Sequence, residues 1–302
     1  MAVYDIISVP DYNNIRNIIN PIISATTSGN TGYGQTAAAA TAAVLGDSVT
    51  KTQWDNLRFD IVNCIVHQIG ALPTIKTVNE GDTIVYNAAE PNYQYLTLAT
   101  QAATNKFDLA AGQYAVESGI SKTYSSDWST SVSLTITATF VNAAAARYFF
   151  NSGGKLRFTS SFTPSTSTQQ NNAWRDTLAG AGTIVFGGNT PSTNFYTLTS
   201  TNQQFFTVSS TSTYAANNWK LYARCDIGNN SSGGATQVII TAVYTDGYVD
   251  PDVLSGHPAT DNPPDGIVRG TIQFTSSHIR AVGALYPNLV ANSFYIVAPI
   301  HS

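Results

Sequence analysis

The densest group of carboxylates in the sequence lies in the stretch Asp246–Asp252, with Asp261 and Asp265 shortly after it. Carboxylate oxygens are the ligands that Ca²⁺ prefers, although the spacing here does not match a helix-loop-helix calcium loop. The glycine and proline residues of this stretch indicate a loop, in which aspartate side chains commonly bond to their own backbone. Residues 246–265 therefore offer two alternatives, a Ca²⁺ site and a solvated turn, and we favour the turn.

Nucleophilic or metal-assisted catalysis has no recognisable pattern in this chain. None of the four histidines has a serine, a cysteine or a second histidine at catalytic or metal-ligand spacing. The sequence motifs of a nucleophile elbow, a phosphate-binding loop and a zinc protease are also missing. We therefore expect a protein that is not an enzyme and that uses no cofactor and no metal ion.

Carbohydrate chemistry is the remaining option, because paired carboxylates hydrolyse glycosidic bonds and exposed aromatic rings stack on sugars. The chain has few glutamates, so aspartates such as Asp250 would have to supply a catalytic pair. Four aromatic residues lie in or beside polar loops and are candidate carbohydrate contacts: Tyr124, Trp128, Tyr214 and Trp219. The same residues also suit anchors of a β-rich core at strand ends, which is the use we favour.

The composition is that of a folded, β-rich protein. Only 11% of the residues are charged, less than half of the usual share of about 25%, while 11% are aromatic. Low charge combined with many aromatic residues argues against a disordered chain. The 14 lysines and arginines are scattered and the net charge is −4, so we expect no nucleic-acid partner and no polybasic membrane contact.

Cys64 and Cys225 are expected to be reduced core residues, since neither has a second ligand at metal-binding spacing. The first residues carry no basic start, and no window approaches the ~18 apolar residues of a membrane span. We therefore expect no membrane insertion, and synthesis and assembly in a cytoplasm.

The N-terminal part of the sequence predicts helices separated by a loop. Isoleucines at helical spacing predict a short helix over residues 8–23, and residues 24–43 form a loop rich in Thr, Ser, Gly and Ala. Thr50 and Gln53 form a capping box that starts a second helix, which is predicted to end before Gly70.

Apolar residues cover more than half of the circumference of this second helix. The polar residues form a narrow stripe of Asn56, Asp60, Asn63 and His67. Such a wide apolar arc suits packing on two sides, so the helix is either buried within its own domain or also docks another subunit. The candidate assembly-interface residues are Trp54, Leu57, Phe59, Ile61, Val62, Ile65, Val66 and Ile69.

After Pro73 the pattern changes to strands, in which serine or threonine alternates with apolar or aromatic residues. The clearest strand is Ser131–Phe140, whose alternation predicts one face on a core and one face of hydroxyls toward solvent. Further strands are expected at residues 83–86, 93–98, 155–162, 182–186, 194–198, 204–209, 219–225, 237–244, 267–274 and 293–298. Short helices are expected at residues 143–151 and 174–178.

This spacing of strands suggests an antiparallel β-sandwich. The expected fold class is therefore α+β, with a small helical N-terminal part over residues 1–72 that docks other proteins. A β-rich, antiparallel, sandwich-like body follows over residues 73–302, and a division of this body near residues 163–180 is an alternative.

The most distinctive segment is Arg147–Phe158, an aromatic cluster broken by a Gly-Gly turn and followed by an alternating strand. Asn, Ser and Gly tolerate the backbone of a helix end, so a helix can reverse into a strand within four positions. The aromatic side chains are expected to pack across this reversal, and the alternative is that they build a pocket. The motif residues are Arg147, Tyr148, Phe149, Phe150, Asn151, Gly153, Gly154, Arg157 and Phe158.

Together with the start of the chain, the loop Gly32–Gln35 and the segment Trp54–Arg58, the segment Ala146–Phe158 resembles uncharacterised virion structural proteins of tailed bacteriophages, notably cyanophages. The resemblance covers the N-terminal half better than the C-terminal half and supplies no catalytic residues. It implies a virion component of the tail, neck, baseplate or fibres, whose partners are other virion proteins and copies of itself. A fibre module that recognises host surface carbohydrate is the alternative.

Overall fold

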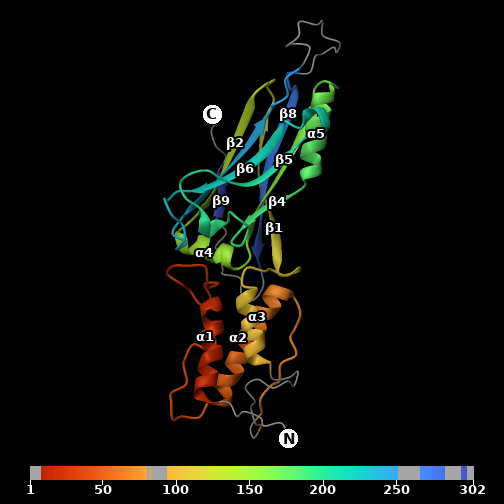
Figure 1. Ribbon diagram of the computed structural model, residues 1–302. Coiled ribbons are helices and arrows are strands. Elements are labelled where there is room, and N and C mark those ends of the chain that lie inside the picture. Colours follow the sequence, from red (N-terminus) through yellow and green to blue (C-terminus); the bar gives the residue numbers. More distant parts are fainter. Residues whose placement is uncertain (1–7, 80–81, 83–93, 251–265, 283–293, 298–302) are drawn as a thin grey trace. The chain divides into compact units, whose positions relative to one another are not determined.

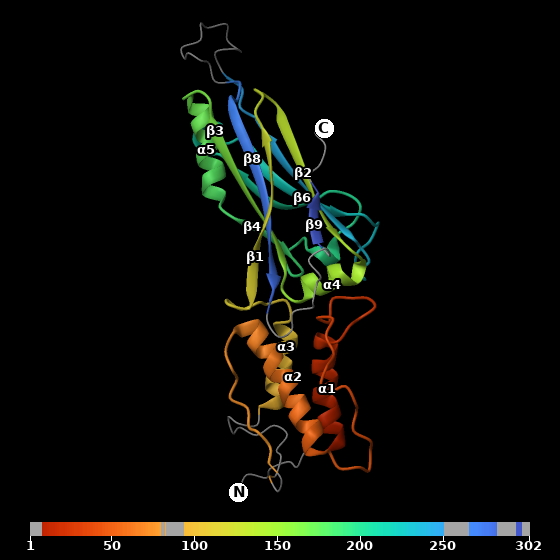
Figure 2. The ribbon, with the colours of Figure 1, turned by 180° about the vertical axis from the view of Figure 1, so that it is seen from behind.

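The computed structural model describes residues 8–79, 82, 94–250, 266–282 and 294–297, and Figures 1 and 2 show the chain from two opposite sides. The chain divides into two compact units. The first contains residues 1–115, 143–154 and 279–290, and the second contains residues 116–142, 155–278 and 291–302. The helical part is therefore larger than residues 1–72, because two later segments of the chain belong to the same unit.

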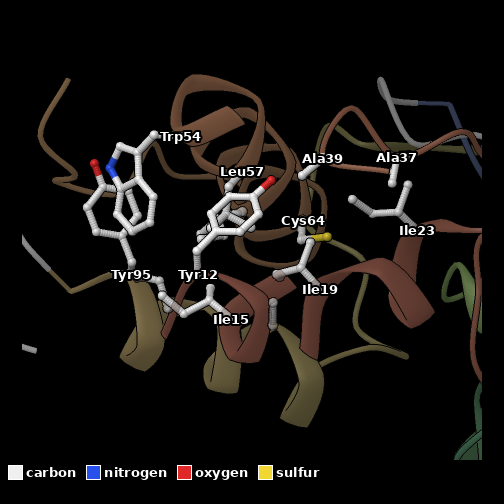
Figure 3. Close-up of a cluster of buried hydrophobic side chains, with 14 of the residues drawn as sticks. Tyr12, Ile15, Ile19, Ile23, Ala37, Ala39, Trp54, Leu57, Cys64 and Tyr95 are labelled. Atoms are coloured by element: carbon white, nitrogen blue, oxygen red, sulfur yellow. The ribbon is translucent and has the colours of Figure 1, made fainter. Parts of the chain in front are cut away.

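Three helices build the core of the first unit: α1 (Val9–Ile23), α2 (Lys51–Ile69) and α3 (Tyr95–Thr104). In this core the rings of Trp54 and Tyr95 lie 4.5 Å apart, and those of Tyr12 and Trp54 lie 6.1 Å apart (Figure 3). Cys64 lies in the same core as a free, fully buried thiol, as predicted. The shared core stabilises all three helices, because isolated helices of this length are marginal in water.

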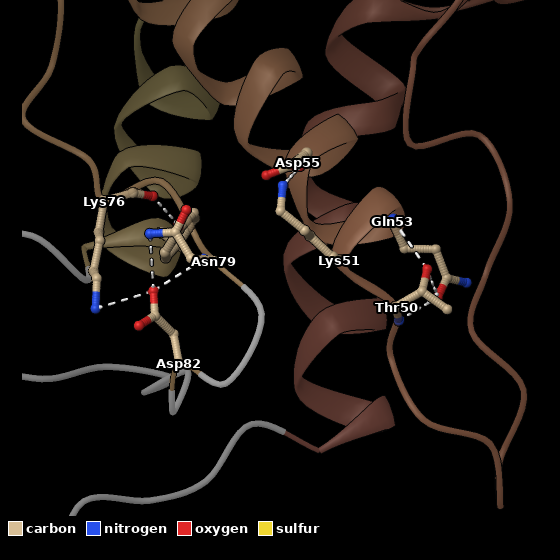
Figure 4. Close-up of polar contacts among 8 residues, drawn as sticks. Thr50, Lys51, Gln53, Asp55, Lys76, Asn79 and Asp82 are labelled. Atoms are coloured by element: carbon tan, nitrogen blue, oxygen red, sulfur yellow. Dashed lines mark hydrogen bonds and ion pairs between the residues drawn. The ribbon is translucent and has the colours of Figure 1, made fainter.

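Local hydrogen bonds define where α2 begins and ends. The Thr50 hydroxyl accepts from the Gln53 backbone N–H at 3.2 Å, and the Gln53 side chain accepts from the Thr50 N–H at 2.9 Å (Figure 4). At the other end Gly70 adopts a φ of +81°, in the left-handed region where glycine commonly ends a helix. Both ends of the helix predicted from the sequence are thus confirmed.

Helix α3 occupies a segment for which the sequence predicted a strand. Residues 93–98 alternate with a period of two, yet a second pattern at helical spacing is also present, and its members are buried: Tyr95, Leu98, Ala99 and Ala102. This face contacts α1 and α2, so packing decided between two patterns that the residues allow. The strand predicted at residues 83–86 lies outside the described residues.

Two sheets form the body of the second unit. The four-stranded sheet has the order β1-β8-β3-β4, with bounds Tyr114–Tyr124, Gly270–Ala281, Lys155–Pro164 and Ile184–Gly187. The five-stranded sheet has the order β5-β6-β7-β2-β9, with bounds Gln203–Ser209, Asn218–Cys225, Gln237–Thr245, Ser131–Phe140 and Phe294–Val297. Every pairing whose register is described is antiparallel. The predicted α+β class with a β-rich, sandwich-like body is confirmed.

Strand β2 has the predicted bounds and the predicted alternation, with every second side chain buried. Its Val132 lies opposite Tyr244 of β7, which in turn lies opposite Trp219 of β6. The two rings stack at 6.1 Å, and the Tyr244 hydroxyl lies 2.7 Å from the Ser160 hydroxyl of β3. Side chains from both sheets thus meet in one buried interior.

Several elements differ from the expectation. Strand β1 was not predicted, and its side chains alternate only between exposed and half-buried, with none fully buried. Residues 194–198 contain a 3₁₀ turn, η1 (Phe195–Thr197), instead of a strand, and a second 3₁₀ turn is η2 (Ser212–Tyr214). Helix α5 (Gln169–Ala181) is longer than expected, because the Thr168 side chain caps its first turn. Across the described part of the chain, no helix is long and apolar enough to cross a bilayer.

Candidate functional site

Helix α4 (Ala143–Asn151) begins and ends at the predicted residues and binds a loop of the first unit. The buried Asn151 amide donates to the carbonyl oxygens of Thr31 and Gly32, each at 3.0 Å. These bonds hold the loop of residues 24–34, because buried backbone carbonyls need hydrogen-bond donors. The motif on α4 and the glycine-rich loop, two separate parts of the family resemblance, are therefore in contact.

Two further contacts complete this α4–loop junction, which consists of Arg147, Tyr148 and Asn151 together with residues 24–34. The Arg147 guanidinium donates to the Thr26 carbonyl at 3.0 Å. Gly34 has a φ of +75°, and a Cβ added there would lie 2.6 Å from the Tyr148 ring. Only glycine fits at this position, both for its backbone conformation and for the approach of the ring.

The turn that follows α4 also requires glycine. Gly153 has a φ of +85°, and a Cβ added there would lie 2.6 Å from the Leu109 side chain. Phe149 and Phe150 are buried, with their rings 5.0 Å apart. The last two motif residues, Arg157 and Phe158, belong to β3 in the second unit.

The aromatic residues of the motif belong to both units. The Phe158 ring contacts Phe205 at 6.3 Å and Phe274 at 5.8 Å inside the second unit. Phe149 and Phe150 are buried in the first unit. All three rings are buried, as a packing role requires, while packing across the reversal stays a prediction.

His67 on α2 is buried and bonds to the turn after α4. Its Nε2 lies 3.0 Å from the Ser152 carbonyl oxygen, so Nε2 carries the proton and donates it. Burial lowers the pKa of His67 to about 4, while the bond to Ser152 acts weakly in the opposite direction. At neutral pH the imidazole is uncharged and serves as a structural donor.

Gln68, the next residue, joins three segments of the first unit. Its amide donates to the Tyr33 hydroxyl at 2.8 Å and to the Ala102 carbonyl at 2.9 Å. The Tyr33 hydroxyl donates in turn to the Lys106 carbonyl at 2.8 Å. Burial raises the pKa of Tyr33 well above its ordinary value, so the phenol stays protonated and remains a donor.

Asp60 and Asn13 hold the second part of the N-terminal loop. The Asp60 carboxylate accepts from the backbone N–H groups of Ala38 and Ala39 at 3.0 and 2.8 Å. Burial raises the pKa of Asp60, although both hydrogen bonds oppose this shift. On α1, Asn13 donates to the Ala43 carbonyl and accepts from the Ala43 N–H, each at 2.9 Å.

The polar stripe predicted on α2 therefore binds loop backbone at Asp60 and His67. The sequence held one signal for this arrangement, which is the composition of residues 24–43. A long ordered loop rich in Thr, Ser, Gly and Ala has little regular backbone pairing of its own, so its buried backbone groups must bond to side chains from other elements. Asp60 and His67 therefore both bond to backbone groups, which is a structural role.

The eight apolar candidates on α2 fall into two groups. Four are buried in the helical core: Trp54, Leu57, Ile61 and Ile65. Phe59 is 57% exposed and Ile69 is 44% exposed, while Val62 and Val66 are half-buried. These last four residues, which we call the outer stripe, follow one another at intervals of three, four and three residues. The helix thus has an inner face in its own core and, at the edge of that face, a partly exposed apolar stripe whose Val62 also packs against the core.

Three of the four candidate carbohydrate contacts are buried. Trp128, Tyr214 and Trp219 are 6%, 8% and 0% exposed, so none of these rings can stack on a sugar, and the core-anchor interpretation is supported. Tyr124 is half-buried and lines an open depression of about 530 Å³ with hydroxyl neighbours that include Ser131 and Ser133.

The acidic stretch begins with buried carboxylates. The Gln170 amide donates to both carboxylate oxygens of Asp246, at 2.8 and 2.9 Å. Asp250 is also buried, at 6% exposed, whereas residues 251–265 lie outside the described residues. Over the part of the chain that the structure describes, no three His, Cys, Asp or Glu side chains are grouped as a metal site would require.

Comparisons with known proteins add no relative. No family model matches this chain, and neither a curated protein nor a solved structure is significantly similar to it.

Proposed function

We propose that this protein is a non-enzymatic structural component of a tailed bacteriophage virion and acts through protein–protein assembly. The observation that carries the proposal is the outer stripe of α2, whose end residues Phe59 and Ile69 are exposed although Val62 also packs against the helical core. The resemblance of residues 146–158 to phage virion proteins supports a virion as the place where this assembly occurs. The polar groups on α2 and α4 support a structural role, because they bond to loop backbone.

The outer stripe has the spacing of a coiled-coil seam. Its exposed end continues past the helix into Leu72, which is 80% exposed. Covering a large apolar side chain contributes about 1.5–3 kcal/mol relative to leaving it in water. An apolar row of this kind on one helix therefore favours a helical partner over solvent.

The occupant that fits best is α2 of a second copy. In an antiparallel pair related by a two-fold axis, Phe59 would lie opposite Ile69 of the other copy, and Val62 opposite Val66. The stripe is then complementary to itself, as an isologous interface requires. Uncharged Asn56 and Asn63 flank it on one side of the same helix, and on the other side Arg58 donates to the Ile75 carbonyl.

Self-association of the purified chain tests this role. We expect the triple variant Phe59→Gln, Ile69→Gln, Leu72→Gln to weaken the dimer by about ten-thousandfold, because each substitution removes roughly 1 kcal/mol of apolar burial in each of the two subunits. Sedimentation velocity over a concentration series gives the dissociation constant. Incorporation of the same variant into phage particles tests the virion setting separately.

A matched control replaces three exposed apolar residues of the second unit: Val116→Gln, Val185→Gln and Val249→Gln. This control should associate like the natural protein. A natural chain that stays monomeric at high concentration, or equal weakening in both variants, would contradict a docking role for α2. The thermal unfolding temperature shows that both variants are folded.

A further inference from the structure

The outward face of the five-stranded sheet carries two cations on either side of an aromatic ring. Lys220, Tyr222 and Arg224 are alternate residues of β6 and are half-buried, whereas Leu221 and Ala223 between them are fully buried. Because side chains alternate between the two faces of a strand, the first three share the outward face. The ring therefore lies between two positive charges on the surface of the second unit.

Hydroxyl groups continue this face across the neighbouring strands. Tyr222 lies opposite Thr241 of β7, which lies opposite Thr135 of β2, and the two threonine hydroxyls are 3.2 Å apart. Residues opposite one another in a ladder share a face, and neighbouring strands are about 4.8 Å apart. The other outward residues of β2 are also hydroxyl-bearing: Ser131, Ser133, Thr137 and Thr139. The result is a platform of hydroxyl groups beside a ring, interrupted on β7 by the apolar residues Ile239 and Val243.

The charge of this face is opposite to that of the whole chain. The outward positions of β2, β5, β6 and β7 contain no aspartate and no glutamate, although the net charge of the protein is −4. Among the described residues, no ion pair involves Lys220 or Arg224. The acid that follows β6, Asp226, instead accepts hydrogen bonds from Thr236 and Gln237.

We infer that this outward face binds an acidic polysaccharide, a sugar chain that carries carboxylate or sulfate groups. The face of the Tyr222 ring suits the apolar side of a sugar ring, and the serine and threonine hydroxyls can exchange hydrogen bonds with sugar hydroxyls. Lys220 and Arg224 supply charge-assisted hydrogen bonds to acidic groups on the sugar chain. Charge complementarity selects an anionic polymer over a neutral one.

A single-stranded nucleic acid is an alternative anionic polymer, whose base rings could stack on aromatic side chains. Nucleic-acid grooves follow the backbone with many cations and several stacked aromatic side chains, whereas the outward positions of β2, β5, β6 and β7 hold two cations and one such ring, and Tyr124 in the adjoining depression would add a second. The hydroxyl platform matches sugar hydroxyls better than phosphates.

The depression beside Tyr124 extends the same face at its β2 edge, because Ser131 and Ser133 belong to both. A polymer that crosses from Lys220 over Val243 to Ser133 would reach a second aromatic ring at Tyr124. This inference does not depend on the outer stripe of α2, so either proposal can fail without the other.

Binding of defined polymers to the full chain tests the inference. Isothermal titration at low ionic strength would use alginate oligosaccharides as the carboxylated probe, dextran sulfate as the sulfated probe, and neutral dextran and a thymidine 30-mer as comparisons. We expect binding to at least one acidic polysaccharide, weakening with added salt. The double variant Lys220→Gln, Arg224→Gln should lose at least about tenfold in affinity, and Tyr222→Ala a similar factor.

The matched control is Lys155→Gln, Arg157→Gln, which removes two cations of the other sheet and leaves the net charge equal to that of the test variant. It should retain natural affinity, and Tyr222→Phe should retain most of it. The inference is overturned if neither acidic polysaccharide binds, if neutral dextran binds equally well, or if the thymidine 30-mer binds more tightly. It is also overturned if both charge variants lose affinity equally, since net charge alone would then explain binding.

Discussion

His67, Gln68 and Asp60 are polar residues of one helix that are buried at 2–4% exposure in the first unit. Asp60 bonds to backbone groups of a loop and His67 to a turn, whereas Gln68 bonds to the Ala102 carbonyl of α3 and to the Tyr33 hydroxyl. Leaving such a group buried without its partner costs about 1–3 kcal/mol, so these contacts define one arrangement of the loops. At the scale of single residues, these three buried polar side chains therefore serve to bond other segments of the protein's own chain.

The stability of the first unit should depend on pH through His67. Its pKa of about 4 lies below the ordinary value of 6.5, so the unfolded chain takes up the proton first on acidification. The stabilising contribution is complete above about pH 6.5, declines as the pH falls from 6.5 to 4, and is absent below 4. The loss is of the order of 3 kcal/mol.

Urea unfolding of the natural chain and of His67→Gln, measured from pH 4 to pH 8, checks this dependence. The glutamine amide can still donate to the Ser152 carbonyl but does not titrate. The difference in free energy of unfolding between the two proteins should therefore change within the window of pH 4–6.5 and be constant above it. A difference that is the same at every pH would contradict the assignment.

At the scale of elements, helix α4 is predicted by its own residues but bonds to a segment far away in the sequence. Its bounds follow from the sequence, whereas its partners are more than a hundred residues earlier in the chain. Through Asn151 and Arg147 it supplies donors to carbonyls of residues 24–34. Helix α4 is therefore part of the helical unit, although strands precede and follow it in the sequence.

The variant Asn151→Asp should destabilise the first unit by about 2–4 kcal/mol, because it removes the donors and places a carboxylate beside two carbonyl oxygens. Chemical denaturation monitored by tryptophan fluorescence gives the free energy. The matched control is Asn229→Asp, which makes the same charge change at an exposed residue whose side-chain oxygen accepts from the Ser231 N–H. The control should change stability by less than about 0.5 kcal/mol. Equal effects of both substitutions would show that charge alone is responsible.

At the scale of the whole molecule, the chain builds two units that each have a core and a buried free cysteine. Cys64 lies in the helical core, and Cys225 lies in the sheet body. Burial raises the pKa of both thiols, and the Cys225 thiol also donates to the Ile227 carbonyl at 3.1 Å. Each thiol is therefore unreactive in the native protein and reports when its own unit opens.

Alkylation over a urea gradient, followed by mass spectrometry of the two cysteine peptides, measures the opening of each unit. In Asn151→Asp, the midpoint for Cys64 should fall by about 1–2 M urea, since the m-value of a domain this size is about 2 kcal/mol/M. The midpoint for Cys225 should stay where it is in the natural protein. If both midpoints fall together, the two units open as one cooperative body.

Local patterns in the sequence were sufficient for β2, for α4 and for both ends of α2. An alternation of ten residues, a helix that stops at a glycine turn and a capping box are short-range signals, and each depends only on neighbouring residues. The antiparallel, β-rich character of the body follows from the same signals.

Tertiary structure decided the features that depend on partners far away in the chain. Residues 93–98 suited both a strand and a helix, and contact with α1 and α2 selected the helix. The sequence predicted a wide apolar arc on α2, but only packing separated buried Trp54 and Ile61 from exposed Phe59. The sequence likewise predicted aromatic residues near loops, but it did not show that Trp128 and Trp219 are buried. The physical reason is that the burial of a side chain and the bonding of a backbone group depend on the segment that packs against them. The spacing of residues along one segment does not specify which other segment that will be.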